Sequence, residues 1–102
     1  MEWDNKVKMV QLGEQKHNSE EAKKDFQKFV LENVESFDGQ AWDIFCNLVD
    51  LPIDEVGQDA EFWKQVYAKI KEVDCNDKKF GLRSGMRIAM IQTICERYII
   101  NH

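Results

Sequence analysis

A helical spacing of apolar side chains is clearest in residues 19–37, SEEAKKDFQKFVLENVESF. The apolar residues recur every three or four positions, which places them on one face of an α-helix, with polar side chains on the other. Ser19 followed by Glu20 and Glu21 predicts the start of a helix. A serine oxygen can accept a hydrogen bond from a free backbone amide, and acidic side chains are favoured at the positive end of the helix dipole. The stretch predicts a helix that packs on a core. The core-facing positions are Ala22, Phe26, Phe29, Val30, Val34 and Phe37.

Three later segments show the same spacing. Asp38 is expected to cap a helix that ends at Leu51, since a residue before proline is pushed out of helical geometry. Asp59 is expected to cap the next helix. The last helix is expected to start at Ser84 or just after it and to run to about Ile100.

The first part of the chain, residues 1–17, carries a weaker apolar series that Gly13 interrupts, so we expect a short helix or a loosely docked N-terminal arm there. The whole chain has five glycines and one proline, too few turn residues for a many-stranded fold. These observations predict an all-α protein, a compact bundle or orthogonal array of four to six helices in one domain spanning residues 1–102. The apolar series of residues 1–17 comprises Trp3, Val7 and Val10, with Met9 as a further candidate.

The last expected helix is apolar on more than one side. Met86, Met90 and Ile94 project in a different direction from its other apolar residues, so both faces need cover. Such a helix lies at the centre of a domain or in an interface with a second chain. We therefore expect either a buried central helix or a homodimer formed through this helix.

Composition excludes several classes of protein. No apolar run is long enough for a secretion signal or a membrane span, and the three cysteines fit neither a disulfide framework nor a CxxC site. We expect a cytoplasmic protein with reduced cysteines. The sequence has no GxSxG, GxGxxG or HExxH motif, and its two histidines are His17 and His102. We therefore expect no enzyme activity, no catalytic residues, no metal and no cofactor.

Charge is distributed unevenly along this acidic chain, whose net charge is −5. Residues 39–74 hold three lysines and eight acids, whereas residues 75–102 hold five cations and two acids. An acidic surface in the middle region, with an exposed tryptophan as anchor, could meet a protein partner with a basic surface. The expected partner-binding residues are Asp50, Asp54, Glu55, Asp59 and Glu61, around an anchor at Trp42 or Trp63.

Residues 41–100 resemble, in the order of their elements, the ARID family of helical DNA-binding domains. The resemblance is carried by three runs, WDIFCNLV at 42–49, FWKQV at 62–66 and ERYI at 96–99. It implies a helical fold and DNA binding. The chain departs from the family in lacking the Gly-Gly before the tryptophan-led helix and in lacking overall basicity.

These patterns favour a small acidic helical protein that acts by stoichiometric binding to a protein partner, as an inhibitor, immunity protein or adaptor. The alternative is a helical nucleic-acid-binding domain that uses the basic loop and the first turn of the last helix. Nucleic acid is the less favoured partner, because the negative net charge opposes binding to phosphates. The nucleic-acid-binding candidates are Lys78, Lys79, Arg83 and Arg87.

Overall fold

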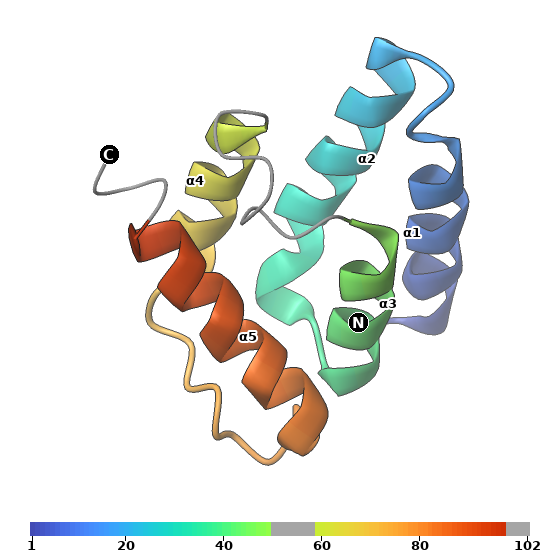
Figure 1. The fold of residues 1–102 in the computed structure, drawn as a ribbon. Helices are drawn as coiled ribbons and strands as arrows, with labels where there is room; N and C mark the ends of the chain where they lie inside the picture. Colours follow the sequence, from blue (N-terminus) through green and yellow to red (C-terminus); the bar gives the residue numbers. More distant parts are fainter. Residues whose placement is uncertain (50–58, 98–102) are drawn as a thin grey trace.

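The computed structural model describes residues 1–49 and 59–97. Within these two ranges the chain forms five α-helices, one short 3-10 helix and no strand (Figure 1). The prediction of an all-α fold with four to six helices is confirmed. The elements are α1 (Trp3–Gln15), α2 (Glu20–Asn33), η1 (Val34–Ser36), α3 (Gly39–Leu48), α4 (Ala60–Ile70) and α5 (Gly81–Cys95).

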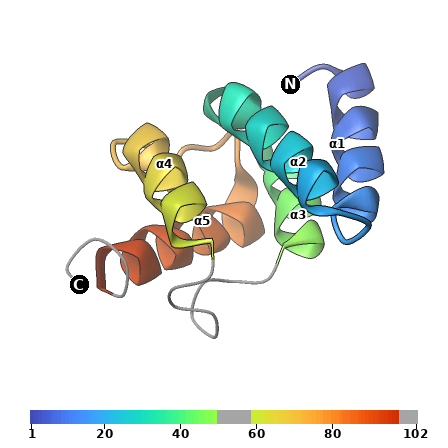
Figure 2. The same ribbon diagram turned by 90° about the horizontal axis from the view of Figure 1, so that it is seen from above.

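The five helices form a closed ring of contacts around one core. Helix α1 packs against α2 and α3, α2 also packs against α4, and α5 packs against both α3 and α4 (Figures 1 and 2). Each helix thus has two helical neighbours, and the outer side of each helix is turned away from the ring. The outer sides are therefore where a surface for another molecule can lie.

Aromatic rings run through the core as one continuous series. Phe45 lies between the two buried tryptophans, with its ring centroid 5.8 Å from that of Trp42 and 5.9 Å from that of Trp63. The series continues to Phe37 beside Trp42 at 5.3 Å and to Phe62 beside Trp63 at 5.2 Å. Aromatic pairs at these distances stabilise a core beyond the area they bury. The series therefore joins the end of η1 to α3 and α4.

Two of the expected helix starts are confirmed in atomic detail. The Ser19 hydroxyl accepts a hydrogen bond from the Ala22 amide at 3.0 Å, and the Asp38 carboxylate accepts one from the Ala41 amide at 2.9 Å. Each bond satisfies a backbone amide that has no partner within its helix. Helices α2 and α3 therefore begin where their local sequence places them.

Helix α4 begins directly after Asp59, so this residue occupies the expected N-cap position, but the expected capping by its side chain is not made. Asp59 has a left-handed backbone conformation, with φ of 53°, and its side chain makes no capping hydrogen bond. Its carboxylate lies 2.7 Å from the Lys23 ammonium and accepts a hydrogen bond from the Gln27 side chain at 3.2 Å. Asp59 therefore ties the start of α4 to α2, because two side chains of α2 bind its Oδ1.

Two helix boundaries also differ from the expected ones. Helix α3 ends at Leu48 rather than at Leu51, and the ammonium of Lys16, which directly follows α1, donates a hydrogen bond to the Leu48 carbonyl. Helix α5 begins at Gly81 rather than at Ser84, because glycine can adopt the positive φ, here 77°, that the turn into the helix requires. The expected end of the last helix near Ile100 lies outside the described residues.

Helix α1 is docked against the domain through a face that its apolar pattern indicates only in part, at Met9. Trp3 and Val7 are 65% and 39% exposed, whereas Lys6, Met9 and Gly13 are buried. The expectation of a short helix is met, and the alternative of a loosely docked arm is not. Trp3 and Val7 therefore form a second set of exposed apolar side chains, on the outer side of α1.

A lysine and a glycine can face the core because each has a specific partner on α3. The Lys6 ammonium lies 2.8 Å from the Asp38 carboxylate and donates a second hydrogen bond to the Gln40 side chain at 2.9 Å. At Gly13 an added Cβ would lie 2.8 Å from the Leu48 side chain, so the missing side chain allows α1 to approach α3 closely. Both features fix the position of α1 on α3.

Gly85 is a sensitive point in the contact between α5 and the loop before it. An added Cβ at this buried glycine would lie 2.3 Å from the backbone oxygen of Cys75. We expect Gly85→Ala to lower the free energy of unfolding by about 1–3 kcal/mol, because backbone must move to admit the methyl group. The effect can be measured by urea denaturation followed by circular dichroism.

Gly13→Ala is the matched control, because it also adds a methyl group within a helix and gains the same helix propensity. Its new methyl group meets only the flexible end of the Leu48 side chain, so its loss of stability should be smaller. A Gly85→Ala protein at least as stable as the wild type would contradict the close packing of α5 on the loop.

Candidate functional site

The expected acidic surface is only partly described by the structure. Asp50, Asp54 and Glu55 lie outside the described residues. Asp59 forms an ion pair with Lys23, so its negative charge is largely compensated. Glu61 is exposed in the first turn of α4 and accepts a hydrogen bond from the Gln65 side chain at 3.4 Å. The described part of this surface therefore presents one exposed carboxylate of the expected five.

The tryptophans expected to anchor that surface are not exposed. Trp42 and Trp63 are both buried within the aromatic series of the core, so the expectation that one of them is partly exposed is wrong. Each of the two tryptophan rings packs against two neighbouring aromatic rings, which hold it inside the ring of helices. Within the described residues the exposed tryptophan is Trp3, on α1.

The outer side of α5 presents a row of exposed apolar side chains, which we call the α5 stripe: Leu82, Met86 and Met90. They are 84%, 65% and 40% exposed and recur every four residues, which places them on one side of the helix. Ile94 is buried with the inner face of α5. The alternative of a fully buried central helix is therefore wrong, since α5 lies at the edge with one face uncovered.

The stripe combines one residue that the sequence pattern missed with two that it indicated. The sequence already placed Met86 and Met90 on a different side of the helix from most of its other apolar residues, which suggested a second apolar face. Leu82 was missed because the helix was expected to begin at Ser84. The positive φ available to Gly81 is the signal that could have extended the helix to include Leu82.

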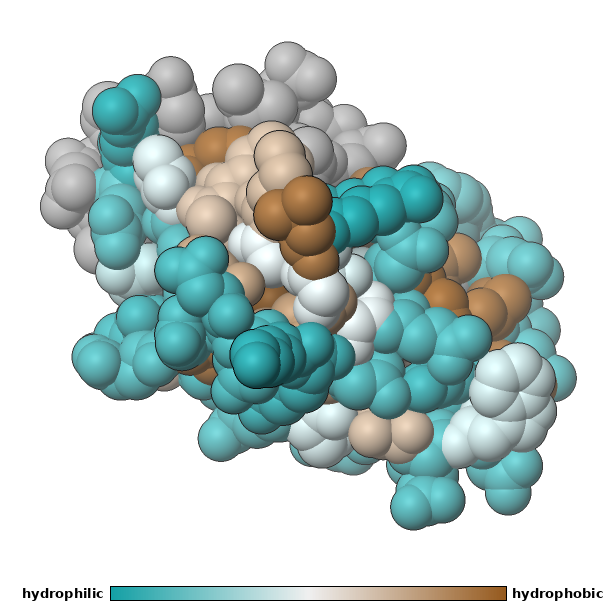
Figure 3. All heavy atoms as spheres, turned by 90° about the horizontal axis from the view of Figure 1, so that it is seen from below, coloured by the Kyte–Doolittle hydropathy of each residue, from teal (hydrophilic) through white to brown (hydrophobic). Residues whose placement is uncertain are grey.

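Two open hollows lie on either side of the α5 stripe. One, of about 620 Å³, is formed by the stripe together with Arg83 and Arg87. The other, of about 450 Å³, lies between Leu82, Met86 and the loop 75–78. Figure 3 shows the molecule from the end at which α5 begins, where hydrophobic residues reach the surface between hydrophilic ones. The surface is thus an apolar ridge with space on both sides.

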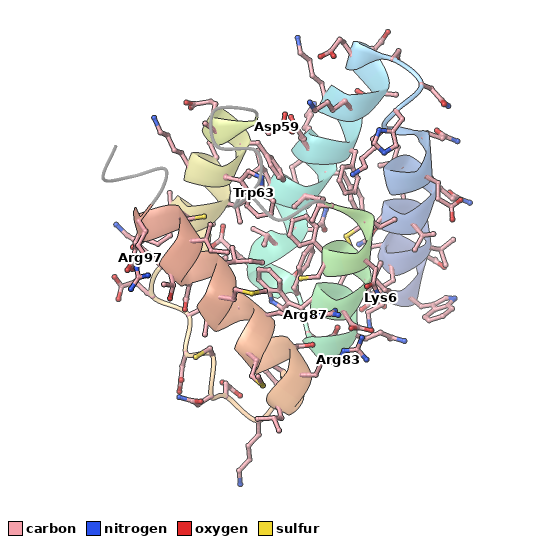
Figure 4. All side chains as sticks on the ribbon, in the orientation of Figure 1. Lys6, Asp59, Trp63, Arg83, Arg87 and Arg97 are labelled. Atoms are coloured by element: carbon pink, nitrogen blue, oxygen red, sulfur yellow. The ribbon has the colours of Figure 1, made fainter. Side chains whose placement is uncertain are left out.

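Arg83 and Arg87 extend from α5 toward α3 and share a single carboxylate (Figure 4). Nη1 of Arg87 lies 2.5 Å from Oδ1 of Asp43, and Nε of Arg83 lies 3.3 Å from the same oxygen. Two guanidinium groups face one carboxylate, so the flank retains one uncompensated positive charge. Arg83 carries most of it toward solvent, because its side chain is 72% exposed.

The other two expected nucleic-acid contacts lie apart from this pair. Lys78 lines the hollow on the loop side of the stripe, beside Asp77. The Lys79 ammonium lies 5.0 Å from the centre of the Phe80 ring, a cation–π contact. Lys78 therefore lies across the stripe from Arg83 and Arg87.

Among the described residues, two cysteine thiols are poorly reactive and no metal-binding cluster is present. Burial raises the pKa of the Cys46 thiol and of the Cys95 thiol to about 11 each, so both are protonated at neutral pH. In the same residues there is no group of three or more His, Cys, Asp or Glu side chains that could hold a metal ion. None of the described helices is long and apolar enough to cross a membrane.

No family model, curated protein or solved structure matches this chain. The resemblance to the ARID family therefore rests on element order and three short runs. In two of these runs the tryptophans, Trp42 and Trp63, are core residues, which explains a similar pattern in helical proteins of any function.

Proposed function

We propose that the chain is a protein-binding module, acting stoichiometrically as an inhibitor, immunity protein or adaptor, whose partner docks on the α5 stripe. The observation that supports this most is the exposure of Leu82, Met86 and Met90 in a row on one helix. Contiguous exposed apolar side chains, rimmed by polar ones, mark interaction surfaces. Single apolar residues scattered over a surface do not need such an explanation.

The chemistry of the stripe suits recognition of another protein. Two of its three residues are methionines, whose flexible side chains adapt to partner surfaces of varied shape. The stripe spans about 12 Å along the helix, at a rise of about 1.5 Å per residue. A specific complex buries about 800 Å² on each partner, so the contact must extend beyond the stripe into both hollows. The hollows provide the room for partner side chains.

The other two candidate surfaces have weaker support. The acidic surface stays a prediction, because three of its five acids lie outside the described residues. Nucleic-acid binding is disfavoured by the net charge of −5 and by the position of Lys78 across the stripe from Arg83 and Arg87. An apolar ridge also offers nothing to a phosphate backbone.

The stripe can be tested with the double variant Met86→Ser, Met90→Ser. Its matched control is Trp3→Ser, Val7→Ser, because Trp3 and Val7 have exposures of 65% and 39%, almost equal to the 65% and 40% of the methionines. Each variant serves as bait in the cells that contain the protein. We expect the wild type and the control to retain a common partner and the stripe variant to bind it at least about 10-fold more weakly, since buried apolar contacts dominate interface energies.

Both variants should unfold within about 0.5 kcal/mol of the wild type, because the replaced side chains are exposed. A partner retained equally by all three baits would show that the stripe is not the binding surface. A partner lost only from the Trp3→Ser, Val7→Ser bait would place the binding surface on α1.

A further inference from the structure

We infer that the α5 stripe receives an acidic amphipathic helix of the partner, with its apolar residues on the stripe and its carboxylates beside Arg83 and Arg87. This inference rests on the proposed function and adds the chemical class of the partner segment. It follows from three features of α5, namely its excess charge, the shape of its outer side and the asymmetry of its two flanks.

The excess charge favours a carboxylate in the partner. Arg83 and Arg87 share Oδ1 of Asp43, so the three groups together carry a charge of one positive unit. Arg83 lines the hollow beside the stripe and is mostly exposed, so a partner carboxylate can reach its guanidinium without displacing Asp43. Guanidinium–carboxylate hydrogen bonds are among the stronger polar contacts at interfaces, and they fix the register of the partner.

The shape of the surface favours a helix. The stripe residues repeat every four positions, and a partner helix with apolar residues at the same spacing presents a matching row. On the loop side, the small residues Gly85 and Ala89 line the hollow, which leaves room for large side chains beside Leu82 and Met86. Side chains of a partner helix can therefore enter both hollows while its axis follows α5.

A second copy of this chain fits the same surface poorly. Antiparallel pairing of two α5 stripes about a twofold axis through Met86 brings each arginine flank against the arginine flank of the other copy. Two like-charged flanks repel, which lowers the affinity of such a dimer. The flank on the loop side carries both Asp77 and Lys78, so it has no comparable preference for acids. The partner's acids are therefore expected along one side of its helix.

Synthetic peptides test the inference directly on the full chain. The acidic peptide carries leucines at helical spacing i, i+4 and i+8 with glutamates along one flank, the basic peptide carries lysines in place of the glutamates, and a third is a scrambled acidic sequence. Binding is followed by fluorescence anisotropy of the labelled peptides. We expect the acidic peptide to bind at least about 10-fold more tightly than either of the others, and its affinity to fall as salt is added.

Two substitutions on the charged flank should act in opposite directions. Arg83→Gln removes the excess positive charge and leaves the Arg87–Asp43 ion pair. It should therefore lower the affinity for the acidic peptide about 2- to 5-fold. Asp43→Asn removes the carboxylate that competes for the two arginines and should raise the affinity for the acidic peptide by a similar factor. Lys28→Gln is the matched control, because Lys28 is 79% exposed on α2 and its loss changes the net charge equally. We expect it to leave peptide affinity unchanged.

Equal affinities for the acidic and basic peptides, or equal effects of Arg83→Gln and Lys28→Gln, would overturn the inference. The proposed function would still stand if the Met86→Ser, Met90→Ser bait lost its cellular partner. If the Met86→Ser, Met90→Ser variant captured its partner and bound the acidic peptide as well as the wild type, both the inference and the proposed function would be contradicted. A dimer seen by light scattering and abolished in that variant would identify a second copy as the occupant, again against the inference.

Discussion

Replacing Trp42 by alanine is expected to lower the free energy of unfolding by about 3–5 kcal/mol, the usual cost of removing a large buried aromatic side chain. Trp42 is almost fully buried and contacts the rings of both Phe37 and Phe45. Its loss leaves a cavity and removes two aromatic contacts at once. Urea denaturation followed by far-ultraviolet circular dichroism measures the effect without relying on tryptophan fluorescence.

Trp3→Ala is the control for this prediction, because Trp3 is the same residue type on an exposed helix face. We expect it to change stability by no more than about 0.5 kcal/mol. A domain of this size is stable by about 5–15 kcal/mol, so Trp42→Ala leaves little folded protein if the wild type is at the lower end. In that case Trp42→Phe can be measured instead, and it should lower the free energy of unfolding by a smaller amount. Equal effects of the two alanine substitutions would place Trp42 at the surface and restore it as a candidate anchor.

Replacing Asp38 by alanine is expected to lower the free energy of unfolding by about 2–4 kcal/mol. The substitution removes the cap of α3 and leaves the Lys6 ammonium buried without its counter-charge. Asp38→Asn keeps the cap and loses only the charge, so its effect should be intermediate. Lys6→Met should be the mildest of the three, because it removes the buried charge and leaves the capping carboxylate partly exposed to water. Thermal or urea unfolding of the three variants gives this order.

The same ion pair should make stability depend on acid pH. Burial acts to raise the pKa of Asp38, but hydrogen bonds from Lys6 and the Ala41 amide, together with nearby positive charge, outweigh burial and lower the pKa below its usual 3.8. The folded state therefore holds this proton less tightly than the unfolded state. Its contribution to stability is complete above the unfolded pKa and is lost as pH falls through the folded pKa.

Unfolding free energies measured from neutral pH down to acid can isolate this contribution. The wild type should lose more stability below about pH 4 than Asp38→Asn, which has no carboxyl group to protonate at this position. An identical loss in the two proteins would show that other carboxyl groups account for the acid sensitivity.

Local sequence was sufficient to predict the helical elements and the starts of α2 and α3, but it placed the start of α5 three residues too late. The Ser19 and Asp38 caps depend on atoms within three residues of each helix start, and the core face of α2 depends on spacing within one helix. These predictions are confirmed because the contacts on which they depend are made within a single element. The same reasoning predicted the apolar second face of α5 from the projection of Met86 and Met90.

Only the tertiary structure decided which faces are buried and where a partner can bind. Lys6 faces inward because Asp38, 32 residues away in the sequence, supplies its counter-charge, and Gly13 faces inward because α3 approaches it closely. The tryptophans chosen as anchors became core residues, because Phe45 joins them across α3 and α4. Spacing along one helix identifies apolar faces, but the contacts that cover them come from distant parts of the chain. Helix α1 is thus held by the buried Met9 together with the Lys6–Asp38 ion pair, whereas the residues of the α5 stripe stay exposed.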